Sequence, residues 1–244
     1  MKNTYNLYSE INFSRKKNIF YKKKYSFGDL KRLIENQFIK LKNKQRGIVV
    51  LTTKNKLKFI IRFYALNRAG FKVLISNSSL TKKEALREKV KPNYMFKGNN
   101  LISLIRPKIK NNNMFDIILK TSGSTNYSKY VYLSNKNISF ITTKMNEEMF
   151  QKKKINELIF SPIEHAFGFG RLHSMMKSDN SLALCDEISL SGFYKYFKLF
   201  KCNSASMPAK ILTSLLEIDL KNFKNNSENL KYIQLSTGYF PLKY

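Results

Sequence analysis

Asp116 to Ser134 read DIILKTSGSTNYSKYVYLS, and this stretch decides how the rest of the sequence is interpreted. It begins with the apolar run Ile117 to Leu119, which is typical of a strand buried in a parallel sheet. A loop of small residues can turn several backbone N–H groups toward an anion, and a lysine such as Lys129 can add a charge for phosphate. The stretch therefore predicts a strand followed by a polyphosphate-binding loop. The loop residues are Thr121, Ser122, Gly123, Ser124 and Thr125.

Composition alone leaves a second interpretation of this loop open. Clusters of serine, threonine and glycine between strands are commonly solvated turns. The stretch is not a Walker A motif, because no Gly-Lys-Ser/Thr follows at the required spacing. The residue types alone therefore favour a turn, and a more specific match is needed to choose the phosphate loop.

A resemblance to a known family supplies that match. Thr121 to Lys129, TSGSTNYSK, resembles the Thr-Ser-Gly-Thr-Thr-Gly-x-Pro-Lys phosphate loop of the adenylate-forming superfamily. This superfamily includes AMP-binding acyl-CoA synthetases, luciferases and the adenylation domains of peptide synthetases. Tyr130 to Ile138 resembles the Gly-Val-x-Leu-Ser-His-x-Asn-Leu that follows. The sequence departs from the family at four positions, where the family has glycine, proline, glycine and histidine: Asn126, Ser128, Tyr130 and Asn135.

Residues 162–170, with glycines beside aromatic residues after a strand, are expected to form a loop that shapes a pocket. Two weaker matches extend the resemblance toward the C-terminus. Pro162, His165 and Gly168 match a Pro-x-x-His-x-x-Gly segment, whose histidine lies near the acyl or aminoacyl site in relatives. A single histidine is otherwise more often a structural hydrogen-bonding residue. Thr237 and Gly238 loosely match a loop that contacts adenine.

The resemblance implies roles for these residues. Thr121 to Thr125 and Lys129 would hold the β- and γ-phosphates of ATP, with Mg²⁺ alongside. His165 and Gly168 would border a carboxylic acid substrate. The resemblance assigns no catalytic residue and no metal ligand to this chain.

Strand-like and helix-like patterns alternate along the rest of the chain. Ile48 to Leu51 and Lys72 to Ile75 read as strands on either side of a helix that Gly70 ends. Thr81 to Glu84 is a capping box that opens another helix. The alternation predicts an α/β fold of doubly wound, mostly parallel sheets with flanking helices. Further elements are expected as helices at 26–42, 137–150, 193–200 and 208–216, and as strands at 94–96, 157–161, 182–184, 204–206 and 232–235.

The domain organisation is expected to have three parts. Residues 1–25 are expected to be an irregular basic arm, residues 26–110 the first α/β part, and residues 111–244 the part with the phosphate loop and substrate pocket. The polar connector 106–113 separates the last two parts. Residues 221–229 are expected to be a polar linker.

The resemblance does not extend to all of the family's functional motifs. The sequence lacks the Tyr-Gly-x-Thr-Glu segment that helps to hold magnesium, the ribose-binding aspartate and the small C-terminal domain with the catalytic lysine. The expectation is a fragment, a split gene product completed by a separate C-terminal polypeptide, or a decayed remnant. Little or no turnover is expected from the chain alone.

Charge and composition set the remaining bounds. A net charge of +29 indicates either an anionic partner or compositional drift, and drift is favoured because lysines occur throughout the chain. No specific nucleic acid is expected as a partner. The most apolar stretch, Leu57 to Ile75, is interrupted by Arg62, Arg68 and Lys72 and does not suit a membrane span. Without a visible secretory signal, and with only two cysteines, the chain is expected to be cytoplasmic.

The function that follows from the resemblance is ATP-dependent activation of a carboxylic acid as an acyl-adenylate. The thiol of CoA or of a carrier protein would then accept the acyl group. The alternative is a non-catalytic basic α/β module that binds a polyanion or a partner protein.

Overall fold

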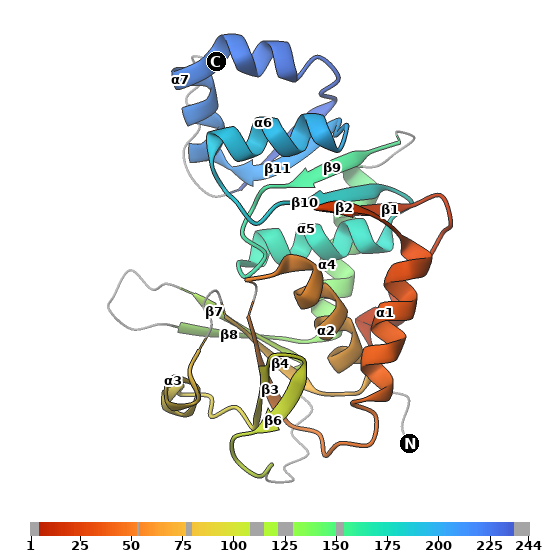
Figure 1. Ribbon diagram of the computed structural model, residues 1–244, viewed down its shortest axis with the longest axis vertical. Helices are drawn as coiled ribbons and strands as arrows, with labels where there is room; N and C mark the ends of the chain where they lie inside the picture. The colour runs from red at the N-terminus through yellow and green to blue at the C-terminus, as the bar shows by residue number, and fades with distance from the viewer. Residues whose placement is uncertain are drawn as a thin grey trace. The chain divides into compact units, whose positions relative to one another are not determined.

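The computed structural model describes residues 5–52, 54–76, 80–107, 115–121, 129–149 and 154–236 (Figure 1). It contains two six-stranded, mostly parallel sheets with flanking helices, which confirms the expected fold class. Contacts divide the chain into two compact units, each built from two segments. Unit 1 comprises residues 1–11 and 29–141, and unit 2 comprises residues 12–28 and 142–244. This division differs from the boundary near residues 106–113 that the sequence suggested.

Unit 1 contains a sheet with the strand order β6-β5-β3-β4-β7-β8. The four central strands are parallel, whereas β6 and β8 are antiparallel edge strands. The strands are β3 (Ile48–Thr52), β4 (Lys72–Ser76), β5 (Tyr94–Lys97), β6 (Asn100–Ser103), β7 (Ile117–Thr121) and β8 (Lys129–Leu133). The helices of this part of the chain are η1 (Leu7–Glu10), α1 (Phe27–Ile39), α2 (Lys56–Arg68), α3 (Lys82–Arg87) and α4 (Asn135–Met149).

The central strands of this sheet are continuous apolar runs, and helices bury both faces of the sheet. Val50, Leu74 and Ile118 form a buried cluster with Ala85 of α3. Helix α2 packs against β3 and β4. Strands that are buried on both faces read as continuous apolar runs, which is why these strands could be recognised in the sequence.

Local signals define the helix boundaries in unit 1. The side chain of Asn55 accepts a hydrogen bond from the Lys58 amide at the start of α2. At α3 both hydrogen bonds of the predicted capping box form, between Thr81 and Glu84. Gly70, with φ at 77°, follows the end of α2, as its sequence position predicted.

Unit 2 contains a sheet with the strand order β12-β11-β9-β10-β1-β2. Its first five strands are parallel, and β2 is antiparallel to β1. The strands are β1 (Asn18–Tyr21), β2 (Lys23–Ser26), β9 (Asn156–Ile159), β10 (Ser181–Leu184), β11 (Ser204–Pro208) and β12 (Tyr232–Ser236). The helices are α5 (Ala166–Lys177), α6 (Leu190–Leu199) and α7 (Ala209–Asn226).

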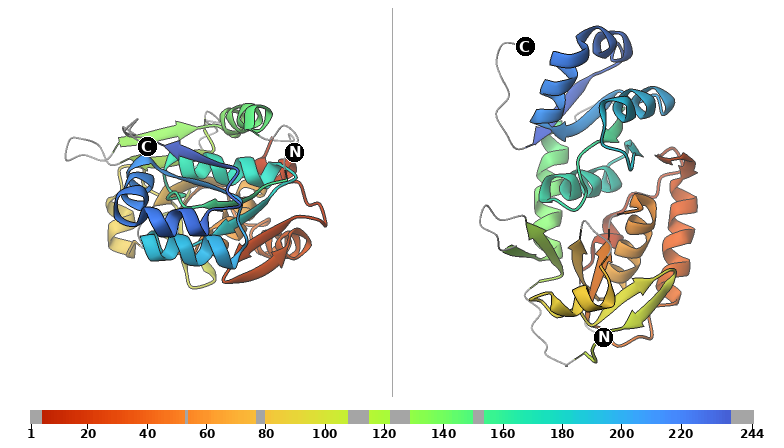
Figure 2. Two further views of the ribbon diagram at one scale, coloured as in Figure 1. Left: turned by 90° about the horizontal axis from the view of Figure 1, so that it is seen from above. Right: turned by 60° about the vertical axis from the view of Figure 1, so that its left-hand side comes forward.

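The two faces of the unit 2 sheet have different chemistry. On one face, Leu158, Ala205 and Met207 form an apolar cluster with Phe193 of α6 and Leu215 of α7. Helix α5 packs on the opposite face (Figures 1 and 2). That opposite face carries polar residues at alternate positions of β9 and β11, because successive side chains of a strand point to opposite faces.

Residues 5–25, expected to be an irregular arm, contain η1, β1 and the start of β2. Leu7 is fully buried, and its amide donates to the side chain of Asn67. In unit 2, β1 pairs with β10, with Ile19 opposite Leu182. The strand was not predicted because lysines flank it in the sequence. It has four residues, and its buried residues alternate with more exposed ones.

A second difference concerns residues 221–229, which were expected to be a polar linker. Helix α7 continues to Asn226, so most of this segment is helical. Phe223 is the residue that requires this, because its side chain is buried in the apolar cluster beneath the helix. None of the described helices combines the length and the apolar composition that a membrane crossing requires.

Lys17 is fully buried beside β1. Its Nζ donates to the carbonyl oxygens of Met175 and Met176 at 3.2 and 3.0 Å, near the C-terminus of α5, and lies 4.0 Å from the centre of the Phe27 ring. Burial lowers the pKa of Lys17 from 10.5 to about 7, against the opposing effect of Asp179. The ammonium group therefore ties the N-terminal segment of unit 2 to α5 at an electrostatic cost.

The buried lysine predicts a pH dependence of stability. Between about pH 7 and 10.5 the unfolded chain holds a proton at Lys17 that the folded chain has lost, so stability should rise with pH across this window. One proton corresponds to a slope of about 1.4 kcal/mol per pH unit. Lys17→Met should remove this contribution from the free energy of unfolding, measured by denaturant titration at several pH values. The exposed neighbour supplies the control Lys16→Met, and equal slopes in both variants would contradict the assignment.

Candidate functional site

The expected phosphate loop connects β7 to β8 in unit 1. Strand β7 pairs with β4 in parallel on one side and with β8 in antiparallel on the other. Thr121 and Lys129 face each other as the last pair of this hairpin, so both ends of the loop are held together by strand pairing. Lys129 is exposed at the first position of β8. Ser122, Gly123, Ser124 and Thr125 lie outside the described residues.

A buried carboxylate fixes the hairpin one pair before the loop. Glu88, at the C-terminal end of α3, is 8% exposed and accepts a hydrogen bond from the Tyr130 hydroxyl. The Nζ of Lys120 lies 2.8 Å from the other oxygen of Glu88. Lys120 and Tyr130 are themselves cross-strand partners. Burial and the contact with Glu88 raise the pKa of Tyr130 to about 12, so the hydroxyl stays protonated and donates.

Sequence reasoning missed this contact. Tyr130 stands where the family has a glycine, and glycine could not donate to Glu88. No local pattern indicates the bond, because 42 residues separate the two partners. The departure from the family pattern therefore adds an attachment at the base of the loop.

The motif after β8 starts helix α4. The Ser134 hydroxyl accepts from the Asn137 amide at 3.2 Å, and the side chain of Asn137 accepts from the Ser134 amide at 3.1 Å. The Asn135 amide donates to Asp116 at 2.8 Å. Asn135 is buried, and its side chain accepts from Asn67 and donates to the Tyr5 carbonyl. In this chain, Ser134 to Asn137 therefore has a structural role next to the loop.

In unit 2, the predicted substrate segment leads from β9 into α5. The sequence suggested a glycine-rich loop over 162–170, but α5 begins at Ala166, so Gly168 and Gly170 are helical. His165 is the N-cap residue; its side chain is exposed and makes no capping hydrogen bond. The apolar spacing of Phe169, Leu172 and Met176 is the sequence signal that could have revealed this helix.

Gly168 is required by a close approach of backbone to backbone. A Cβ atom at this position would lie 2.2 Å from the carbonyl oxygen of Pro162. The same carbonyl accepts from the His165 amide at 3.2 Å, which closes the turn before α5. Gly168 thus lets the helix pack directly on the turn that presents His165. This is a structural reason for the match at Pro162, His165 and Gly168.

Three polar atoms near the carboxyl ends of the unit 2 strands have no hydrogen-bond partner among the described residues. They are the hydroxyl oxygens of Ser161 and Ser206 and the amide oxygen of Gln234. Ser206 lies beside Gln234 on one side and beside Ile159 on the other. Buried polar groups are nearly always bonded to protein, water or ligand, so these atoms mark a place where a polar molecule can bind. Sequence reasoning did not select them, although Ser204 and Ser206 alternate with apolar residues.

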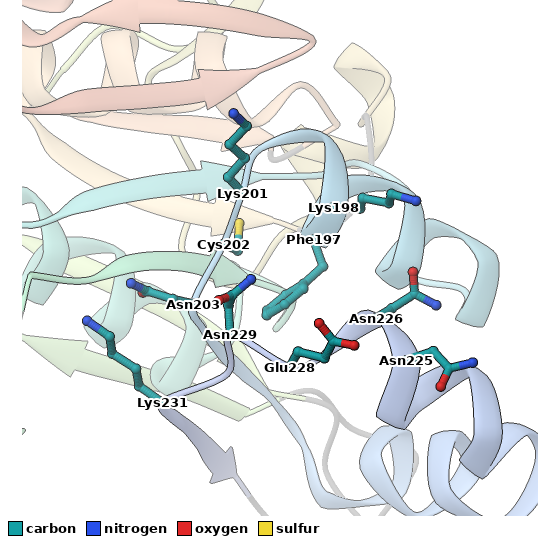
Figure 3. Close-up of a pocket in the computed structure, with 10 residues that line it drawn as sticks. All are labelled: Phe197, Lys198, Lys201, Cys202, Asn203, Asn225, Asn226, Glu228, Asn229 and Lys231. Atoms are coloured by element: carbon teal, nitrogen blue, oxygen red, sulfur yellow. The ribbon is translucent and has the colours of Figure 1, made fainter.

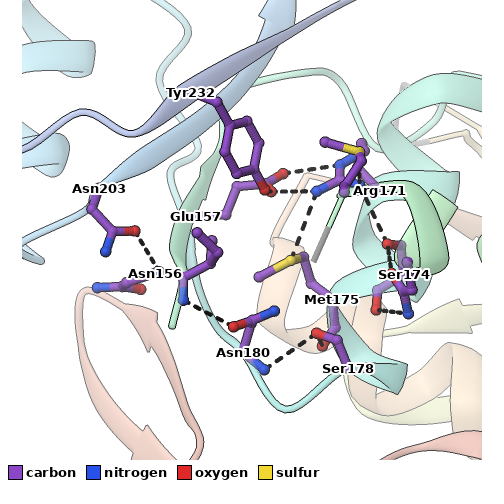
Figure 4. Close-up of polar contacts among 12 residues, drawn as sticks. Asn156, Glu157, Arg171, Ser174, Met175, Ser178, Asn180, Asn203 and Tyr232 are labelled. Atoms are coloured by element: carbon purple, nitrogen blue, oxygen red, sulfur yellow. Dashed lines mark hydrogen bonds and ion pairs between the residues drawn. The ribbon is translucent and has the colours of Figure 1, made fainter. Parts of the chain in front are cut away.

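A buried ion pair lies on the same face of the sheet (Figure 4). Glu157 of β9 and Arg171 of α5 both have fully buried side chains and form two contacts, one of 3.1 Å at Arg171 Nε. The Tyr232 hydroxyl donates to Glu157 at 3.1 Å. Burial, followed by the charge of Glu157, raises the pKa of Tyr232 above its usual value. These contacts fix α5, and therefore His165, against the strands.

The remaining predicted residues, Thr237 and Gly238, lie outside the described residues just after β12. Within the described ranges, no group of three or more histidine, cysteine, aspartate or glutamate side chains could hold a metal ion. The structure therefore describes two candidate sites, one in each unit. They are the base of the phosphate loop in unit 1 and the carboxyl edge of the sheet in unit 2.

The two helical glycines give a matched test of the close approach. Gly168→Ala should destabilise the chain by about 1–3 kcal/mol, because the new methyl group meets fixed backbone. Gly170→Ala meets no atom within 4 Å and should be neutral or stabilising by about 1 kcal/mol, because alanine favours helix. Thermal unfolding of both variants measures the difference. Equal effects would show that Gly168 is not required by packing.

No protein-family profile matches the sequence, and no curated protein does. Solved structures do match. The chain superposes on o-succinylbenzoate CoA synthetase (MenE) from Bacillus subtilis in complex with the acyl-adenylate OSB-AMP, with a TM-score of 0.75 and 17% identity, over 96% of this chain and 68% of that one. The inhibitor-bound N-terminal domain of FACL13 from Mycobacterium tuberculosis matches with a TM-score of 0.76 and 13% identity, over 97% and 71%.

ATP-bound MatB from Rhodopseudomonas palustris matches with a TM-score of 0.74 and 15% identity, over 93% of this chain and 54% of that one. The chain thus spans between about half and seven tenths of these structures. At these identities the likeness concerns the fold. The chain therefore has the fold of these three proteins over nearly its whole length, which is the fold that the sequence resemblance implies.

Proposed function

We propose that this chain binds ATP and a carboxylic acid and takes part in the ATP-dependent activation of that acid as an acyl-adenylate. The observation that carries the proposal is the position of the TSGSTNYSK stretch. Its ends are the last pair of the β7–β8 hairpin, in a fold that matches enzymes solved with ATP, AMP or an acyl-adenylate. The sequence motif and the fold agree.

In the proposed reaction, a carboxylate oxygen of the acid attacks the α-phosphorus of ATP. An acyl–oxygen–phosphorus linkage forms, the bond to the β-phosphate oxygen breaks, and pyrophosphate leaves. The protein's part is to hold the phosphates and offset the charge that develops on them. Thr121 to Thr125 would supply hydroxyl and amide donors, and Lys129 would supply a positive charge.

The acid would bind at the carboxyl edge of the unit 2 sheet. His165 is exposed at the start of α5, and Gly168 permits the turn that presents it. The unpartnered oxygens of Ser161 and Ser206 add hydrogen-bonding capacity on this face. Thr237 and Gly238 would contact adenine. Ligands of open α/β sheets bind at the carboxyl ends of the strands, which supports this placement.

Mg²⁺ would enter with ATP as its phosphate complex. A crystal structure of the Bacillus subtilis synthetase contains ATP and a magnesium ion. The described residues include no carboxylate cluster that could hold this ion, so no residue is assigned to it. A thiol of CoA or of a carrier protein would then accept the acyl group. The cytoplasm, where thiols stay reduced, is the proposed compartment.

Lys129 provides the first test of the proposal. Lys129→Ala should weaken ATP binding by roughly tenfold, because a charge-assisted contact to phosphate contributes about 1.5–3 kcal/mol. Lys136→Ala removes the same charge from an exposed position seven residues away and should leave the affinity within about twofold. Calorimetric titration at low and moderate salt measures both variants. Equal weakening in both, or binding that disappears in moderate salt, would favour the non-catalytic basic module.

ATP–pyrophosphate exchange with a panel of carboxylic acids tests the reaction itself. We expect ATP binding with little exchange, because the family's magnesium-binding, ribose-binding and catalytic-lysine motifs do not occur in these 244 residues. Rapid exchange that depends on one acid would establish the activity and contradict this expectation. Absence of ATP binding would contradict the proposed function.

A further inference from the structure

A pocket of about 570 Å³ opens in unit 2 at the ends of helices α6 and α7 (Figure 3). Eight of its ten lining residues are polar, and the other two are Phe197 and Cys202. Three lysines contribute to its wall, together with one glutamate: Lys198, Lys201, Lys231 and Glu228. The volume is that of a small-molecule site, and the lining selects a polar ligand.

This pocket lies at the opposite edge of the sheet from the proposed substrate site. Asn203 directly precedes β11, and Lys231 directly precedes β12. Strands β9, β10, β11 and β12 are parallel, so their amino ends share one edge of the sheet. The acyl-adenylate chemistry proposed above belongs to the carboxyl edge. The pocket is therefore a separate feature that the proposed function does not use.

A rigid network of amides holds this edge in place. The side chain of Asn203 accepts from the Asn156 amide at 2.8 Å and donates to the Lys154 carbonyl at 3.2 Å. The Lys231 amide donates to the Asn203 carbonyl at 2.7 Å. The Nζ of Lys231 also donates to the Lys154 carbonyl at 3.0 Å, which positions its charge at the rim. The wall of the pocket is thus organised before any ligand binds.

The carbonyl groups at the end of α6 would repel an anion if they were exposed, but they are already paired. Lys201, with φ at 51°, forms a left-handed C-terminal turn in which the Cys202 amide donates to Phe197 and the Lys201 amide to Lys198. The side chain of Asn156 donates to the carbonyls of Phe200 and Lys201. Most of the carbonyl groups at this end of the helix therefore already accept hydrogen bonds within the protein.

The end of α7 is closed in the same way. The Ser227 amide and hydroxyl donate to the carbonyls of Lys224 and Phe223, and the side chain of Asn226 donates to Asn222. What the two helices present to the pocket is therefore mainly side chains. The polar groups among them are the ammonium and amide groups of lysines and asparagines and the carboxylate of Glu228.

The lysines of the pocket are not neutralised by carboxylates. Within the described parts of the chain, neither Lys198 nor Lys201 forms an ion pair. A neighbouring pocket of about 320 Å³ shares Asn203 and Lys231 and adds Lys154. Four lysines therefore line these two adjacent pockets. Such a cluster attracts an anion, and phosphate is the anion for which lysine is a suitable point-charge partner.

Glu228 makes the ligand class more specific. Among the described residues it forms no ion pair, and it lies in the pocket beside the asparagines (Figure 3). A carboxylate disfavours a bare anion but accepts hydrogen bonds from hydroxyl groups. Asparagine side chains both donate and accept, which also suits hydroxyls. The combination fits a molecule with a phosphate at one end and hydroxyl groups at the other.

We propose that the amino edge of the unit 2 sheet is a second ligand site, which binds a phosphorylated sugar. Lys198, Lys201 and Lys231 hold the phosphate, and Glu228 with the neighbouring asparagines holds sugar hydroxyls. A free sugar phosphate and the sugar phosphate of a nucleotide present the same groups. The test below separates these two sources.

Lysine acetylation followed by mass spectrometry tests the site in the full chain. Ribose 5-phosphate should protect Lys198 and Lys201 from acetylation in a saturable way, by roughly fivefold or more, because a bound phosphate occupies their ammonium groups. Lys195 of α6 and Lys210 of α7 are exposed outside the pocket and should keep their reactivity. Free ribose, or chloride at the same ionic strength, should protect no lysine. Uniform protection of all lysines, or equal protection by chloride, would overturn the proposal.

Two variants of equal charge change sharpen the test. Lys198→Ala with Lys201→Ala should weaken ribose 5-phosphate binding by roughly tenfold or more, whereas Lys195→Ala with Lys210→Ala should change it less than about twofold. Equal loss in both would mean attraction by net charge alone and would overturn the site. Stronger protection by AMP than by ribose 5-phosphate would identify a nucleotide as the source, and weaker protection would identify a free sugar phosphate.

Glu228→Gln tests the hydroxyl end independently. Removing the carboxylate should strengthen binding of inorganic phosphate, because a negative charge leaves the pocket. The ratio of the affinity for ribose 5-phosphate to the affinity for phosphate should fall by roughly threefold or more, because the sugar hydroxyls lose an acceptor. An unchanged preference would overturn the sugar assignment. None of these readouts involves Lys129, so failure here and failure of ATP binding at the proposed loop are distinguishable.

Discussion

The ion pair between Glu157 and Arg171 is the interaction on which the organisation of unit 2 depends. Both side chains are fully buried, so each charge has lost its water and relies on the other. Removing one partner of such a pair typically costs about 3–5 kcal/mol, because the remaining charge stays buried. The pair joins the middle of the sheet to α5, and α5 begins directly after His165. The position of the candidate substrate segment therefore follows from an electrostatic constraint in the core.

Strand direction then separates two kinds of surface in this unit. At the carboxyl edge, the buried hydroxyl oxygens of Ser161 and Ser206 have no hydrogen-bond partner among the described residues and lie on the face that α5 covers. At the amino edge, the side-chain amide nitrogens of Asn156 and Asn203 donate to backbone carbonyls within the protein, and the lysines of the pocket are exposed. In a parallel sheet the amino ends of all strands lie at one edge and the carboxyl ends at the other, so the two edges carry different sets of side chains. One sheet can thus carry two unrelated ligand sites.

Sequence patterns predicted best the strands whose residues are all buried. They predicted poorly the elements in which only some residues are buried. The central strands β3, β4 and β7 are apolar on both faces and were recognised, and the capping box at Thr81 placed the start of α3. Strand β1 was missed because its two buried residues lie among lysines and its partner, β10, is distant in the chain. Helix α5 was missed because its two glycines suggested a loop, although Gly168 serves a close approach that only the folded structure reveals. The bond from Tyr130 to Glu88 likewise depends on tertiary contact.

The pairing of β1 with β10 has a consequence for synthesis of the chain. Asn18 and Ser181, at the start of the two strands, are 163 residues apart. At about 5–20 residues per second, a ribosome needs on the order of 10 to 30 seconds to make the partner after β1 has emerged. During that interval the backbone edge of β1 that pairs with β10 has no native neighbour. The lysines that flank it would act as gatekeepers against aggregation of the nascent polypeptide.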